Sequence, residues 1–115
     1  MNRISLFTSI VLLISIDGRS DHLSFDDVFP ILEEKCLACH HHPGAPSGLS
    51  METYQLLLKG GENGAIVIAG EAENSELIRR IRGEAHPRMP FNGPPYLTDL
   101  EIELFENWID AGLKP

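Results

Sequence analysis

The most chemically specific segment of the chain is Cys36-Leu37-Ala38-Cys39-His40. Two residues between the cysteines let both thiols reach the vinyl-derived carbons on one edge of a haem, and the adjacent histidine can lie beneath the iron as its proximal ligand. No other cysteine occurs in the sequence. The segment therefore predicts one covalently attached haem c (iron), with Cys36 and Cys39 as attachment residues and His40 as an iron ligand.

The same segment allows three other interpretations. A disulfide between the two cysteines is compatible with an oxidising compartment, because no other cysteine competes. A zinc site would need the cysteines together with neighbouring histidines, and consecutive histidines converge poorly on one tetrahedron. A thioredoxin-like redox pair needs a βαβ context that the chain does not show. The histidine directly after the second cysteine favours haem over all three.

A second axial ligand decides between electron transfer and chemistry at an open iron site. Of the three methionines, Met1 belongs to the predicted signal peptide, and Met51 is expected to pack into the core as a flexible filler. Met89 lies in the proline-rich segment 86–95, whose restricted backbone would hold a thioether at a fixed position. We predict Met89 as the second ligand, with His86 as the competing candidate. An open sixth position would instead indicate a haem-based sensor or a small peroxidase-like domain.

The sequence does not decide the roles of several other polar residues. Arg88 could form a bidentate pair with a haem propionate, and an exposed position in its loop is equally compatible with the sequence. Tyr54 and Tyr96 could donate to propionates or be partly buried in the core. No chemistry is assigned to the other histidines, His22, His41 and His42.

Short helices and shaped loops must position these residues, because eight prolines and ten glycines interrupt a chain of 115 residues. A first helix is predicted to start from Asp26 or Asp27 as N-cap, with Pro30 in its first turn, and to end near Cys36. The last helix has the strongest start signal, with Thr98 and Glu101 as a capping box, and Trp108 is expected in the core. Further helices are predicted over 51–59, with Ser50 as N-cap, and over 76–82; segment 64–70 is predicted to be extended and buried.

The N-terminal segment 1–20 fits a secretory signal peptide, since a basic start precedes an apolar run too short to span a bilayer unaided. Residues 21–115 would then form one domain, periplasmic or otherwise exported. The net charge of −8 argues against nucleic acid or anionic membrane surfaces as partners. It suits redox partner proteins that carry a basic docking patch. The membrane would be contacted only through an uncleaved N-terminal segment.

Ordered matches along the chain resemble the planctomycete-type cytochrome c domain, within the broader class I cytochrome c group. They run from about Val28 to Leu113. The matching segments are 28–32, 36–40, 48–49, Tyr54 and Leu57 before 60–61, 66–67 before Gly70, 75–81, 87–90, and 97–98 with 101–102 before 108–112.

This resemblance implies an all-α, cytochrome c-like fold of about four short helices around one covalent haem. The first and last helices are expected to cross, with His40 as the proximal ligand and Met89 as the distal ligand. From the residues and the export signal together, we predict a monohaem c-type cytochrome that carries single electrons outside the cytoplasm and is not an enzyme in its own right.

Overall fold

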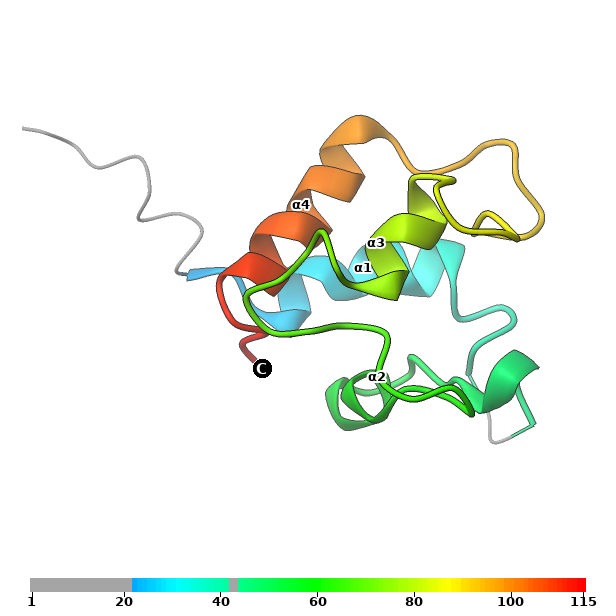
Figure 1. Cartoon of the computed structure of the whole chain (residues 1–115), viewed down its shortest axis with the longest axis horizontal. Helices are drawn as coiled ribbons and strands as arrows, with labels where there is room; N and C mark the ends of the chain where they lie inside the picture. The colour runs from blue at the N-terminus through cyan, green and yellow to red at the C-terminus, as the bar shows by residue number, and fades with distance from the viewer. Residues whose placement is uncertain (1–21, 42–43) are drawn as a thin grey trace, which may run out of the picture.

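The computed structural model describes residues 22–41 and 44–115, and helices dominate it (Figure 1). In chain order the elements are α1 (Phe25–Lys35), the 3-10 turn η2 (Pro46–Gly48), α2 (Tyr54–Lys59), α3 (Glu76–Ile81) and α4 (Asp99–Asp110). The described residues contain no strand, only one isolated antiparallel bridge between Gly61 and Gly64. The predicted all-α class is therefore confirmed, while the predicted signal peptide, 1–20, lies outside the described residues.

Within the described part of the chain, no helix is both long and apolar enough to cross a bilayer.

Helix α1 begins at Phe25, because Ser24 and Asp27 cap its first turn. The Asp27 carboxylate accepts hydrogen bonds from the Ser24 backbone N–H at 2.8 Å and from its hydroxyl at 3.3 Å. The prediction that Asp26 or Asp27 is the N-cap is wrong, and so Pro30 lies inside the helix and not in its first turn. Its missing N–H leaves the Asp26 carbonyl without a helical partner, but both residues are exposed and water can serve that carbonyl.

The core is built where α4 packs against α1 and α3. Phe25 from α1 and Trp108 from α4 meet with ring centroids 6.2 Å apart, and Trp108 is fully buried. This confirms the prediction that Trp108 lies in the core. The other buried residues of these helices are Val28 and Leu32 of α1, Leu77, Ile78 and Ile81 of α3, and Ile102, Phe105 and Ile109 of α4.

The C-terminal segment ties three helices together through its backbone carbonyls. The Lys114 carbonyl accepts a hydrogen bond from the Phe25 backbone N–H at 2.9 Å and from the Trp108 indole at 2.9 Å. The Tyr54 hydroxyl donates to the Leu113 carbonyl at 2.6 Å. Tyr54 is the first residue of α2, and its hydroxyl thus makes a structural hydrogen bond.

Helix α4 starts as the sequence predicts. The Thr98 hydroxyl accepts from the Glu101 backbone N–H at 3.2 Å, and the Glu101 carboxylate accepts from the Thr98 backbone N–H at 2.9 Å. Helix α3 ends one residue before its predicted limit, at Ile81.

Two predictions for the middle of the chain need correction. Helix α2 begins at Tyr54 and not at Met51, because the Thr53 hydroxyl accepts from the Leu56 backbone N–H at 3.2 Å and takes the capping role expected of Ser50. In the segment predicted to be extended and buried, Ile66 and Val67 are buried, but Ile68 is 41% exposed.

Candidate haem site

The Cys-x-x-Cys-His segment forms a turn at the C-terminal end of α1. Cys36 is the C-cap, and its backbone N–H donates to the Leu32 carbonyl at 2.8 Å. The Cys36 carbonyl in turn accepts from the N–H of Cys39 at 3.3 Å and of His40 at 3.0 Å. The Cys36 carbonyl therefore stabilises the turn that contains both cysteines and the histidine.

His40 is buried, at 9% exposure, and is held by two hydrogen bonds to the chain that follows η2. Its ring Nδ1 lies 3.0 Å from the Leu49 carbonyl oxygen, and its own carbonyl accepts from the Met51 N–H at 2.7 Å. Because a carbonyl can only accept, Nδ1 carries the hydrogen and Nε2 keeps its lone pair. A ring fixed through Nδ1 by a backbone carbonyl, with Nε2 left to coordinate, is the usual arrangement of a metal-bound histidine.

The two cysteines are free thiols in different surroundings. Cys39 is exposed, whereas Cys36 is half-buried and packs against the hydrophobic core. Burial raises the pKa of the Cys36 thiol from 9.0 to about 12, because the thiolate would lose its hydration. Cys36 is therefore a neutral thiol at physiological pH.

This difference predicts unequal alkylation of the chain produced without haem attachment. At a given pH below 9, the raised pKa lowers the thiolate fraction of Cys36 about a thousandfold, and the thiolate is the reacting species. We expect Cys39 to react with iodoacetamide much faster, and the Cys36 rate to rise about tenfold per pH unit up to about 12. Peptide mass spectrometry over time measures both rates. Equal rates would mean that Cys36 is not buried before haem is attached.

Met89 lies in the loop between α3 and α4 and is half-buried against the same hydrophobic core as Cys36. Its backbone N–H donates to the Arg80 carbonyl at 3.0 Å. Figure 1 shows this loop at the same end of the molecule as the chain that leaves α1. Met51, by contrast, is 5% exposed within the core cluster, which confirms its predicted packing role. His86, the competing ligand candidate, is exposed.

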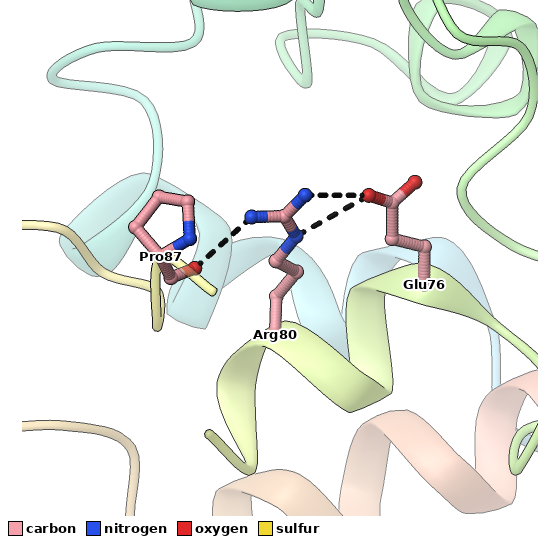
Figure 2. A network of polar contacts seen from close by, with 3 residues as sticks. All are labelled: Glu76, Arg80 and Pro87. Carbon is pink, nitrogen blue, oxygen red and sulfur yellow. Dashed lines mark hydrogen bonds and ion pairs between the residues drawn. The ribbon is translucent and has the colours of Figure 1, made fainter. Parts of the chain in front are cut away.

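Arg80 anchors the Met89 loop to α3 with its side chain as well as its backbone (Figure 2). Its Nη1 donates to the Pro87 carbonyl at 3.3 Å, while its Nε and Nη2 donate to the Glu76 carboxylate at 3.2 and 2.9 Å. The carboxylate lies one helical turn away and fixes the direction of the guanidinium. We refer to Glu76, Arg80 and Pro87 as the loop anchor.

Sequence reasoning did not single out the loop anchor or the Leu49 carbonyl. The Glu76 and Arg80 spacing does signal a helical ion pair. Nothing in the sequence marks which backbone carbonyl each side chain would meet.

The donor set of the turn fits a c-type haem. Within residues 22–41 and 44–115, no three His, Cys, Asp or Glu side chains are grouped so that they could hold a metal ion. Two unpaired thiols and one histidine with an uncommitted ring nitrogen are what covalent haem attachment and proximal ligation require.

An all-helical domain that carries a Cys-x-x-Cys-His turn at a helix end, with its histidine buried and backed by a carbonyl, falls in the class of c-type cytochromes. The chain belongs to the planctomycete cytochrome C family, whose family model matches residues 36–93. The match contains the cysteine–histidine turn and Met89 with the first part of its loop, and it leaves α1 and α4 outside. Membership makes the chain a haem-binding cytochrome and implies covalently bound haem c. No significant match was found among curated proteins or among solved structures.

Proposed function

We propose that the chain is a monohaem c-type cytochrome that carries single electrons outside the cytoplasm and has no enzymatic activity of its own. The observation that carries the proposal is His40: its ring is buried, its Nδ1 is held by the Leu49 carbonyl at 3.0 Å, and its Nε2 is left to bind iron. When bound, the haem supplies a one-electron iron couple. The chain attaches the group, orients it and tunes its potential.

Each predicted site residue has a role in this proposal. Cys36 and Cys39 form the two thioethers, and the single cysteine pair limits the chain to one haem. His40 is the proximal ligand and Met89 the distal one. A thioether opposite a histidine raises the reduction potential, which suits a carrier that accepts electrons from donors of lower potential.

The experiment that tests the proposal is spectroscopy of the protein purified from a host that attaches haem. We expect haem to remain on the chain in a denaturing gel, and the oxidised spectrum to be low-spin with a methionine-to-iron charge-transfer band. Cys36→Ala combined with Cys39→Ala should abolish the covalent attachment. A high-spin protein that binds carbon monoxide readily would move the assignment to a sensor or peroxidase-like domain. No haem at all would refute the central claim.

Export and the partner are part of the same proposal. They are supported by the signal-like segment 1–20 and by the net charge of −8. The proposed partners are redox proteins with basic docking patches, and association of opposite charges slows as salt screens them. We expect the electron-transfer rate with a basic partner to fall steeply between low and physiological ionic strength. A rate independent of salt would contradict steering by the acidic surface.

The loop anchor supports the Met89 assignment and can be tested separately. Arg80→Met keeps the aliphatic stem but removes the bonds to Glu76 and Pro87. Because both side chains of the ion pair are partly exposed, we expect the free energy of unfolding to change by less than about 1 kcal/mol. The methionine-to-iron band should nevertheless disappear at a lower temperature than in the wild type. Arg79→Met, at an exposed position of the same helix, is the control and should leave the band unchanged.

A further inference from the structure

Arg88 is a half-buried cation that has no counter-ion among the described residues. Its Nε is enclosed by the protein and has no hydrogen-bond partner within residues 22–41 and 44–115. Arg80 and Arg82, in contrast, pair with the carboxylates of Glu76 and Glu106 at 2.9 and 2.6 Å. A partly desolvated charge is costly unless an opposite charge or hydrogen bonds compensate it. The described residues therefore contain an arginine whose charge no carboxylate among them compensates, and which could accept an anion.

The surroundings of Arg88 fix its guanidinium in place. Its Cζ lies 4.0 Å from the centroid of the Tyr96 ring, a cation–π stack. On Gly83, a Cβ would approach the Arg88 Cδ to 2.9 Å, and on Gly93 a Cβ would come within 2.3 Å of the Tyr96 ring. The absence of side chains at both glycines thus makes room for the stack. We refer to Gly83, Arg88, Gly93 and Tyr96 as the arginine stack.

The stack sits beside the proposed distal ligand. Arg88 directly precedes Met89, whose N–H is bonded to the Arg80 carbonyl at 3.0 Å. The terminal nitrogens of Arg88 make no hydrogen bond within the described residues and are not enclosed as Nε is. A planar guanidinium of this kind is shaped for two parallel hydrogen bonds to one carboxylate. The anion that cytochrome membership brings close to Met89 is the haem with its propionate groups.

We propose that Arg88, which is held against the Tyr96 ring in the arginine stack, binds a propionate carboxylate of the haem through its terminal nitrogens. This inference rests on the proposed function, since it needs haem bound with Met89 as ligand. Of the two interpretations that the sequence allowed for Arg88, this inference selects propionate binding over an exposed position in the loop. It also gives Tyr96 a positioning role, because the tyrosine ring stacks against the guanidinium.

The test compares haem-loaded wild type with Arg88→Gln and Arg88→Lys, and uses Arg79→Gln as the matched control. Arg79 is exposed and lies on α3, so its replacement removes the same charge away from the stack. Two quantities are measured in each protein. They are the midpoint potential and the propionate carboxylate stretches in the reduced-minus-oxidised infrared spectrum, assigned by carbon-13 labelling of the haem carboxylates.

Loss of a cation near the iron favours the ferric state. Arg88→Gln should therefore raise the ferric-to-ferrous ratio at a fixed potential about tenfold, which corresponds to a fall in the midpoint potential of about 59 mV. It should also move one propionate stretch. Arg88→Lys should shift the potential less, because it keeps the charge but not the fork geometry. Arg79→Gln should change little, since exposed charges are screened.

The inference is overturned if Arg88→Gln matches Arg79→Gln in both measurements while the methionine-to-iron band is intact. If Arg88→Gln does not fold, the wild type still decides: propionate stretches at the position of free, hydrated carboxylates overturn the inference. Failure of the proposed function looks different. It would appear in the wild type as missing haem or a missing methionine-to-iron band.

Discussion

Replacing Met89 by alanine is expected to abolish the methionine-to-iron charge-transfer band and to open the sixth coordination position. The oxidised variant should become high-spin or bind a water, and the reduced variant should bind carbon monoxide. Because a thioether ligand raises the potential, its loss should lower the midpoint potential by more than about 59 mV, a tenfold change in the redox equilibrium. Optical spectra, carbon monoxide titration and potentiometry measure the three effects.

Met51, the other methionine among the described residues, provides a matched control. Met51 is 5% exposed in the core, so Met51→Ala removes the same thioether from a packing position. We expect it to lower the free energy of unfolding by about 2–5 kcal/mol and to leave the charge-transfer band in place. His86→Ala should leave both stability and spectrum unchanged, since His86 is exposed.

Two results would contradict the Met89 assignment. In the first, Met89→Ala keeps the charge-transfer band and Met51→Ala loses it, which would make Met51 the ligand. In the second, His86→Ala opens the sixth position, which would assign a bis-histidine haem of lower potential.

Trp108→Ala should be the most destabilising single change in the helical core. The side chain is fully buried, it lies 6.2 Å from the Phe25 ring, and its indole donates to the Lys114 carbonyl at 2.9 Å. Removing a buried tryptophan leaves a cavity and costs about 3–5 kcal/mol, a large part of the stability of a small domain. Here the Lys114 carbonyl also loses the hydrogen bond from the indole. Urea unfolding of the haem-loaded protein, followed by far-ultraviolet circular dichroism, measures the loss.

Two further variants separate the contributions at this position. Trp108→Phe keeps most of the ring but loses the indole hydrogen bond, so its cost should fall between those of wild type and alanine. Leu100→Ala, at a position of α4 that is 78% exposed, should change the free energy of unfolding by no more than about 0.5 kcal/mol. A loss below about 1 kcal/mol for Trp108→Ala would show that α1 and α4 do not depend on this contact.

The local features of the site and of α4 could be predicted from the sequence because they depend on residues close together in the chain. The Cys-x-x-Cys-His spacing fixes two thiols and an imidazole within one turn. The capping box of Thr98 and Glu101 spans four residues and forms as predicted. Family membership agrees with what this short-range chemistry indicated.

The starts of α1 and α2 were predicted less well, because several good caps compete within a few residues. Ser24, Asp26 and Asp27 all have capping side chains, and so do Ser50 and Thr53. Intrinsic preference barely separates them. The tertiary structure favours the start that places Phe25 against Trp108 in the core, and with this start Pro30 falls inside α1.

The sequence by itself determined the class of the protein and the candidates for the attachment residues and the proximal ligand, because these follow from residue types at short fixed spacing. Only the tertiary structure decided which carbonyl holds the His40 ring, which helix anchors the Met89 loop, and that Arg88 is stacked on Tyr96 with no counter-ion in the part of the chain that the structure describes. The physical reason is that every residue carries a backbone carbonyl, so the sequence cannot mark the one that will be used. Folding selects it when segments distant in the chain pack together.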